Sequence, residues 1–274
     1  MNEHAAIFDD LIVLLTDTLE QLGHSVQLAT AHLDTSRVNL LLGHTAFLEQ
    51  EAYDSIRHGG AKFVIFQMET LTDRAGVPRV SEAYLDILSR ANQVWDFSKN
   101  NVAYLAARGC RDAQYIPLGY SSRLERVVRP AQKETDVLFY GTGNARRVRI
   151  VEALRARGLR VEAVFRAYGA VRDEAIGRSK IVLNIHSFDG SELEQVRISY
   201  LLNNRCFVIS ESAEGNPWGN GVVFCEYDKL VECCAEYARP TMEARRSEIA
   251  GMGYEALKAL PMGESLRSAM ERIG

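Results

Sequence analysis

The first regular pattern in the chain is amphipathic and covers residues 5–22. Apolar side chains recur there at alternating spacings of four and three residues, at Phe8, Ile12, Leu15, Leu19 and Leu22. This spacing is typical of one face of an α-helix, and Gly23 is a residue that commonly ends one. We therefore expect the chain to enter its first domain through a helix.

Short apolar runs of β-strand type follow, and helical patterns separate most of them. The expected strands lie in HSVQLAT, RVNLLLGH, AKFVIFQME, QVWDFS and AQYIPLGY. The expected helices lie in SEAYLDILSRA and KNNVAYLAARG. Alternation of this kind indicates βαβ units and a parallel sheet.

A polar stretch, SSRLERVVRPAQKETD, separates this half from a second alternating series. The second series has strands in DVLFYG, RVEAVF, KIVLNIH, CFVISE and GVVFCEY, helices near 145–157, 171–178 and 191–203, and further helices at the end. We predict an α/β protein of two Rossmann-like domains that face a cleft. The domains are 1–122 and 136–274, joined by a linker over 123–135, and the last helix is a candidate to pack back on the first domain.

Composition narrows the class of protein only moderately. Hydrophobic residues make up 47% of the 274 residues, charged residues 25%, and the formal net charge is -4. These values are ordinary for a globular protein with a proper core, and they indicate no general attraction to nucleic acid or anionic membranes. A local basic cluster nevertheless exists in the second half, at Arg146, Arg147, Arg149, Arg155, Arg157 and Arg160.

The cysteines and the N-terminus favour a cytoplasmic protein. The five cysteines form no CxxC pair, and most lie in apolar runs, so we expect buried reduced thiols. The acidic start MNEHAAIFDD lacks the basic residues of a secretion signal, and LIVLL is too short to span a bilayer.

The turn GTGNARR has the character of a phosphate-binding turn between a strand and a helix. Arg146 stands where a dinucleotide fingerprint needs its third glycine, and the chain has no Gly-Lys pair for a P-loop. Free backbone N–H groups and the helix dipole still favour an anion there. We expect Gly141, Thr142 and Asn144 to approach phosphates, with Arg146, Arg147 or Arg149 adding charge. The alternative for each arginine is a solvated helix face.

A second group of polar residues lies in KIVLNIHSFDGSELEQVRISYLLNNRCFVISE. Asn184 and His186 end a buried strand, and Glu194 and Arg197 share a face of the following helix. His186 is either a structural strand-end histidine or a site residue near carboxylates. Glu194 and Arg197 either pair with each other or contact a ligand.

These segments carry a resemblance to a known family. DVLFYGTGNARR, SKIVLNIHSF and VRISYLLNNRCFVISE make residues 136–250 look like the donor-binding domain of GT-B glycosyltransferases of the bacterial group 1 kind. The first half resembles the acceptor domain mainly by pattern, helped by WDFSKNNVAYLAARG and IPLGY.

The resemblance implies a hexosyltransferase that uses a UDP-, GDP- or dTDP-sugar and no resident cofactor. His186, Glu194 and Arg197 would join the turn residues in holding the donor. For an inverting reaction, His44 and Glu69 are the candidate bases for the acceptor hydroxyl, with Asp96 behind them. Each residue also has a structural alternative. His44 would then be a turn histidine with its hydrogen bonds satisfied, and Glu69 would be an acidic residue at the start of a helix. The chain contains no Asp-x-Asp pair, so we expect metal-independent transfer.

One departure from the family pattern leaves other functions open. Many relatives carry a glutamate thought to hold the donor ribose, and the ungapped position here is Tyr200. A non-catalytic nucleotide-sugar binder is therefore the first alternative, and a phage-type DNA-base glycosyltransferase is the second. The donor base, the sugar, the acceptor, the stereochemical outcome and the oligomeric state do not follow from the sequence.

Overall fold

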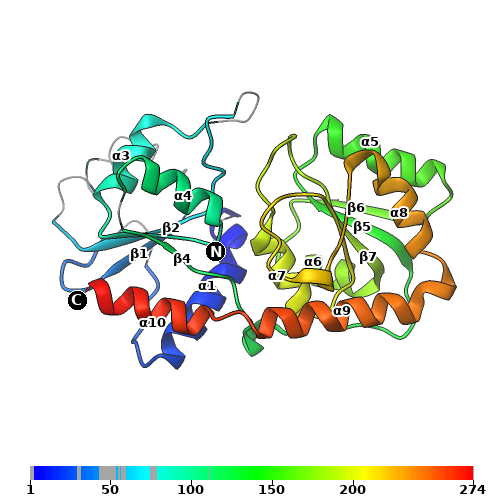
Figure 1. The fold of residues 1–274 in the computed structure, drawn as a ribbon. Helices are drawn as coiled ribbons and strands as arrows, with labels where there is room; N and C mark the ends of the chain where they lie inside the picture. The colour runs from blue at the N-terminus through cyan, green and yellow to red at the C-terminus, as the bar shows by residue number, and fades with distance from the viewer. Residues whose placement is uncertain are drawn as a thin grey trace. The chain divides into compact units, whose positions relative to one another are not determined.

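Two parallel β-sheets organise the chain in the computed structural model (Figure 1). The structure describes residues 3–29, 32–42, 54, 56, 60–74, 79–110 and 112–273. The chain divides into two compact units: unit 1 is Met1–Leu15 with Gly119–Leu260, and unit 2 is Thr16–Leu118 with Pro261–Gly274. The predicted mixed α/β fold class is confirmed.

Unit 1 contains a parallel sheet in the order β6-β5-β7-β8-β9. Its strands are β5 (Thr135–Gly141), β6 (Val161–Phe165), β7 (Ser179–Asn184), β8 (Val208–Glu211) and β9 (Val223–Cys225). Its helices are α5 (Ala145–Ala156), α6 (Gly169–Arg178), α7 (Gln195–Asn203), α8 (Leu230–Tyr237) and α9 (Glu243–Lys258). Figure 1 shows α5 and α8 on one face of this sheet and α6 and α7 on the other.

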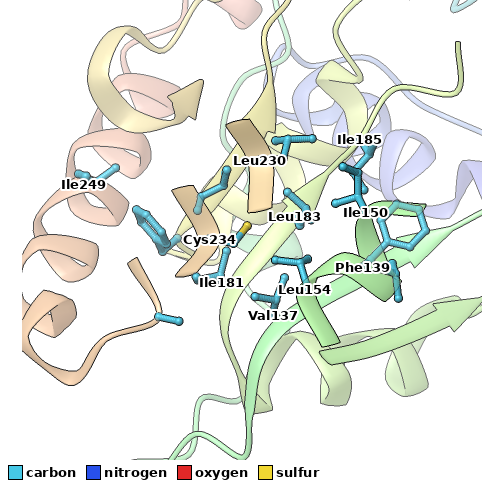
Figure 2. Packing of buried hydrophobic residues seen from close by; sticks show 14 of the residues in the cluster. Val137, Phe139, Ile150, Leu154, Ile181, Leu183, Ile185, Leu230, Cys234 and Ile249 are labelled. Carbon is cyan, nitrogen blue, oxygen red and sulfur yellow. The ribbon is translucent and has the colours of Figure 1, made fainter. Parts of the chain in front are cut away.

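The core of unit 1 forms because its central strands are apolar on both faces. Val137 and Phe139 of β5 and Ile181 and Leu183 of β7 alternate along their strands and pack against Leu154 of α5 (Figure 2). All five side chains are at most 1% exposed. Burial on both faces is the reason why these strands read as continuous apolar runs rather than alternating ones.

Unit 2 contains the second parallel sheet, in the order β1-β2-β3-β4. Its strands are β1 (Asn39–Leu42), β2 (Phe63–Gln67), β3 (Gln93–Asp96) and β4 (Ala113–Tyr115), and its helices include α3 (Glu82–Arg90), α4 (Lys99–Ala107) and α10 (Met262–Ile273). Helix α10 belongs to this unit: Gln93 Nε2 donates to the Ala269 carbonyl at 2.9 Å, and Leu266 is fully buried. Helix α1 (Glu3–Gln21) begins in unit 1 and ends in unit 2.

One expected strand is absent from the described residues of unit 2. Residues 24–29, within the HSVQLAT run, form no strand. Their apolar positions do not become a buried face, since Leu28 is 69% exposed. Alternation predicts a strand only when a neighbouring strand and a core receive it, and here neither does.

The segment expected to be a linker, 123–135, is held closely in unit 1. The side chain of Asn204 accepts from the backbone N–H groups of Arg126 and Val127 at 2.8 and 2.9 Å, and donates to the Leu124 carbonyl at 2.8 Å. Gly177 allows the Val128 carbonyl to approach, because a Cβ at Gly177 would lie 2.1 Å from that oxygen. Long-range side-chain partners of this kind leave no periodic signal in the segment itself.

The cysteines form no disulfide bond. All five are free, and Cys206 and Cys234 are buried. No helix within the described residues combines the length and the apolar character that crossing a membrane requires.

Candidate functional site

The polar residues of unit 1 gather where the strand order of its sheet reverses. The chain places β6 on one side of β5 and β7 on the other, so the connections that leave β5 and β7 diverge. In open parallel sheets, the crevice at the carboxyl ends of two such strands is the usual place for a ligand. The turn 141–144 and residues 184–187 both lie at this point.

The turn after β5 has a backbone that requires glycine. Gly141 adopts φ +141°, and a Cβ there would lie 2.8 Å from Nη2 of Arg197. Asn144 caps α5 by accepting from the Arg147 backbone N–H at 2.9 Å, and its Nδ2 donates to the Ser187 carbonyl at 2.8 Å. The first turn of α5 is thereby tied to the loop that follows β7.

Arg147 is a buried structural cation of the site. Its side chain is 4% exposed, and Nε donates to the Ile185 carbonyl at 2.9 Å, while Nη1 donates to the Thr142 carbonyl and hydroxyl at 3.0 and 2.8 Å. Burial lowers the pKa of Arg147, the charge of Arg197 lowers it further, and Glu194, 3.6 Å from Nη2, opposes both. Arg147 therefore fixes the turn rather than presenting its charge to solvent.

Arg146 reaches across the sheet to the end of β8. Its guanidinium forms a two-armed ion pair with Glu211, with one arm at 2.6 Å, and also donates to the His186 carbonyl at 3.2 Å. The guanidinium carbon lies 3.9 Å from the centre of the Tyr227 ring, whose hydroxyl donates to the Arg146 carbonyl at 2.7 Å. The hydrogen bond that Arg146 donates to Glu211 raises the pKa of Arg146 despite partial burial.

His186 lies between two hydrogen-bond acceptors. Nδ1 is 2.7 Å from a carboxylate oxygen of Glu194, and Nε2 is 3.3 Å from the Ser212 carbonyl. Only the imidazolium donates from both nitrogens, so this setting favours the protonated ring. Burial acts to lower the pKa of His186, but the hydrogen bond and charge of Glu194, with the charge of Glu211, raise it overall.

Glu194 and Asn184 connect His186 to Arg197. Asn184 Nδ2 donates to Glu194 Oε2 at 2.8 Å and to the Ser210 hydroxyl at 3.0 Å, and its Oδ1 accepts from Arg197 Nη1 at 2.9 Å. Burial would raise the pKa of Glu194, but its partners, His186 first, lower it to about 2. Glu194 is therefore an ionised carboxylate near neutral pH.

The structure brings eight of the residues expected at the donor site together, whereas Arg149, the further arginine offered for the phosphates, lies exposed on α5 and outside this group. The eight, which one network joins, are Gly141, Thr142, Asn144, Arg146, Arg147, His186, Glu194 and Arg197. The ionisable groups of this network are three guanidiniums, the imidazole of His186 and two carboxylates, those of Glu194 and Glu211. The local charge is therefore positive even with a neutral His186, and protonation of His186 makes it more so, in a chain whose formal net charge is -4.

Sequence reasoning assigned no ligand role to three members of this network. Asn184 and Glu211 end their strands, and that position was the available signal for both. Tyr227 precedes α8 and is distant in sequence from Arg146, so no local pattern marks their contact.

Tyr200 lies elsewhere in unit 1. It is 2% exposed, its hydroxyl donates to Asp173 Oδ1 at 2.7 Å, and its ring lies 4.1 Å from the Arg172 guanidinium carbon. Arg172 in turn pairs with Asp10 of α1. The Tyr200 side chain thus holds α6 and α7 together, while Glu194 is the carboxylate of this region that enters the network.

The candidate bases that the structure describes, Glu69 and Asp96, belong to unit 2. His44 lies outside the described residues. Glu69 follows β2 and is half-buried, and its carbonyl accepts from Gln67 and Asn101 at 2.8 and 2.9 Å. Asp96 is fully buried, and its Oδ2 accepts from the same two amides, so it joins β2, β3 and α4.

Metal-ligand side chains do not cluster in the described part of the chain. No group of three or more His, Cys, Asp or Glu residues there has the spacing to hold a metal ion.

Comparison with curated proteins finds relatives among viral proteins. The chain is 32% identical over 129 residues to uncharacterized protein L138 of Acanthamoeba polyphaga mimivirus, covering 43% of this chain and 14% of that protein. It is 24% identical over 179 residues to uncharacterized protein L140 of the same virus, covering 61% and 57%. The chain thus spans a small part of the first relative and little more than half of the second. No family model matches the chain.

Solved structures establish the class of fold. The structure of TarM superimposes with a TM-score of 0.62 at 9% sequence identity, and the match covers 86% of this chain and 54% of the TarM chain. The glycosylation-associated Gap123 complex of Streptococcus agalactiae has a TM-score of 0.51 at 9% identity, covering 93% and 56%. TarM is a GT-B-type glycosyltransferase, and the chain shares its α/β fold of two parallel sheets. At these identities, the similarity concerns the fold alone.

Proposed function

We propose that the chain is a glycosyltransferase that moves a sugar from a nucleotide diphosphate to an acceptor, with the donor bound by unit 1. The observation that carries this proposal is the turn 141–144 at the reversal of strand order. There a helix N-terminus, the exposed residues Thr142 and Gly143, and the Arg197 guanidinium lie together. A helix N-terminus beside a cation suits a diphosphate.

Within this site the arginines take different roles. Arg147 donates to backbone carbonyls and is buried, so we assign it to positioning the turn. Arg146 is neutralised by Glu211 in a two-armed pair, which leaves it less charge for a ligand. Arg197 is half-exposed and uses Nη1 for Asn184, while Nη2 lies beside Gly141. Arg197 is therefore the cation best placed to contact a diphosphate.

Glu194 and His186 supply the groups for hydroxyl recognition. Glu194 is 23% exposed as a side chain and ionised, so it can accept from hydroxyls of the ribose or the sugar. His186 is 3% exposed as a side chain, and we assign it to orienting Glu194. Release of the diphosphate would be assisted by Arg197 and the α5 N-terminus, which makes metal-independent transfer our proposal.

Donor binding is the first test. The chain is titrated by calorimetry with UDP, GDP and dTDP and their sugar conjugates, beside Arg197→Ala and the exposed control Arg155→Ala on α5. We expect one nucleotide to bind, its affinity to fall at least tenfold in Arg197→Ala, and no change in Arg155→Ala. Equal affinities in the two variants would contradict the assignment of Arg197, and no binding by any nucleotide would remove the donor site.

A transfer assay tests the catalytic bases. His44 and Glu69 remain the candidates for deprotonating the acceptor hydroxyl. We expect His44→Ala or Glu69→Gln to lower kcat at least a hundredfold while nucleotide affinity stays unchanged. Near-normal rates in both variants would eliminate both residues.

A non-catalytic nucleotide-sugar binder is the second candidate, and the placement of Tyr200 favours it. That side chain is committed to Asp173, so the ribose contact proposed for the relatives' glutamate must come from Glu194 or be absent. Slow hydrolysis of a bound sugar nucleotide would distinguish an enzyme from a binder.

A further inference from the structure

A second concave site lies at the opposite ends of the strands of unit 1. It has a volume of about 230 Å³. Its lining comes from the first residues of β7, from residues 205–207 just before β8, from the segment 129–133, and from the first turns of α9. The candidate donor site is at the carboxyl ends of β5 and β7, whereas this pocket is at their amino ends. The two sites are therefore separated by the length of the sheet.

The charged side chains in the lining of this pocket are mostly basic. Five of its residues are cationic, namely Arg129, Lys133, Lys180, Arg205 and Arg246, and Glu243 is the acidic one. In a chain with a formal net charge of -4, this is a local reversal of sign. The field inside a low-dielectric hollow lined by one sign of charge favours the opposite ion.

Most of these cations rest on neutral acceptors. Lys133 Nζ donates to the Gly177 carbonyl at 2.5 Å, and Arg129 Nη1 donates to the Arg205 carbonyl at 3.0 Å. A carbonyl orients a cation without cancelling its charge. Burial lowers the pKa of Lys133, and the charge of Arg129 lowers it further.

Arg246 forms the buried wall of the pocket. It is 8% exposed, and its Nη1 donates to the Tyr237 and Arg239 carbonyls at 2.5 and 3.1 Å. The guanidinium of Arg205 lies 3.5 Å from the Tyr254 ring centre. Among the pocket's cations, all of them in the described part of unit 1, Lys180 is the one with an ion pair, to Asp136 at 2.7 Å.

We propose that this pocket binds a small phosphate-bearing anion, independently of the donor site. A volume of 230 Å³ is below the usual 300–1,000 Å³ of drug-sized ligand sites, so it suits a phosphate or diphosphate group better than a whole nucleotide sugar. Five guanidinium and ammonium groups outnumber the carboxylates near them, Glu243 in the lining and Asp136 beside Lys180, and an excess of such groups is the chemistry that recognises a phosphate. The inference does not depend on the proposed transferase activity.

Calorimetry of the full chain with inorganic pyrophosphate, and separately with glucose 1-phosphate, tests the pocket. We expect the double variant Arg129→Gln/Lys133→Gln to weaken binding at least tenfold. The double control Arg157→Gln/Arg267→Gln, which removes the same charge from exposed sites, should bind as the unaltered chain does. Binding of pyrophosphate alone would identify a diphosphate ligand, and binding of both probes would identify a general phosphate site.

Three outcomes would overturn the proposal. One is that neither probe binds the unaltered chain. Another is that the control double variant loses as much affinity as the pocket variant, because net charge alone would then explain binding. The last is that Arg197→Ala abolishes binding while the pocket variant does not, since the anion would then occupy the donor site. Thermal melting verifies that each variant is folded. If Arg129→Gln/Lys133→Gln is unstable, the single variant Arg129→Gln, at an exposed position, replaces it.

Discussion

At the residue scale, the structure distinguishes the three arginines of the candidate site by the acceptors that they contact. Arg146, Arg147 and Arg197 look equivalent as candidates from spacing and charge. Their acceptors differ: a carboxylate for Arg146, backbone carbonyls for Arg147, and an amide oxygen for Arg197. The acceptor decides how much positive charge remains for an anion, and no local sequence pattern encodes it.

The Glu194–His186 pair makes stability depend on pH. The pKa of Glu194 is lowered to about 2 from an ordinary 4.5, so its contribution is complete above pH 4.5 and is lost as pH falls toward 2. His186 has a raised pKa, so its share is complete below its ordinary pKa of 6.5 and is lost as pH rises through the raised value. We expect Glu194→Gln to reduce the free energy of unfolding by about 2 kcal/mol at pH 7.

Urea denaturation of the unaltered chain and Glu194→Gln at pH 7, 4 and 3 measures this effect. The difference between the two proteins should shrink as the pH decreases below 4.5. A difference that stays constant down to pH 3 would show that the carboxylate charge is not what stabilises the pair.

Gly141 offers a second residue-scale prediction. Gly141→Ala places a Cβ 2.8 Å from Arg197 at a backbone φ of +141°, so we expect a loss of about 1 kcal/mol in stability and at least tenfold in nucleotide affinity. Gly158→Ala is the matched control, because Gly158 also has a positive φ of +81° but no atom within 4 Å of its Cβ position. Calorimetry should show unchanged nucleotide binding in Gly158→Ala. An equal loss in both variants would assign the effect to backbone strain alone.

At the scale of elements, the segment 123–135 shows how irregular chain is held in place. Its order comes from Asn204 at the end of α7, which bonds three of its backbone groups. A buried amide with several backbone partners is costly to remove, since each partner is left unsatisfied.

Asn204→Ala tests this anchoring. We expect the free energy of unfolding to fall by about 3 kcal/mol, because one buried and two partly buried hydrogen bonds to the backbone are lost. Asn216→Ala, which alters bonds in an exposed turn, should cost less than about 1 kcal/mol. Denaturant titration compares the two, and similar losses would mean that the 123–135 segment is held by its other contacts.

At the scale of the whole molecule, each unit contains the end of the chain that is farther in sequence from its own sheet. Met1–Leu15 belongs to the unit of the second sheet, β5–β9, and Pro261–Gly274 belongs to the unit of the first. The reason for the second placement is visible in α10, where Met262, Leu266 and Ala269 are at most 3% exposed. These side chains complete the core of unit 2.

Deletion of residues 261–274 therefore has a directional consequence. We expect unit 2 to lose protection from hydrogen exchange in β2–β4, while β5, β7 and β8 in unit 1 keep theirs. Hydrogen-exchange mass spectrometry distinguishes these strands directly. Equal loss of protection in both sheets would show that the units fold as one cooperative body.

The sequence by itself determined the described helices, nearly all the described strands and most of the residues gathered at the end of the second sheet. Apolar periodicity is local, and the rule that ligands lie beyond the carboxyl ends of parallel strands selects a few positions from it. Only the tertiary structure decided that the HSVQLAT run forms no strand over residues 24–29, that Arg147 is structural, that Tyr200 faces Asp173, and that five cations meet at the opposite ends of the strands. Each of these depends on a partner more than about twenty residues away in sequence, or on the lack of a neighbouring strand. Such partners are defined by folding, because burial and hydrogen bonding are properties of the packed chain and not of its local pattern.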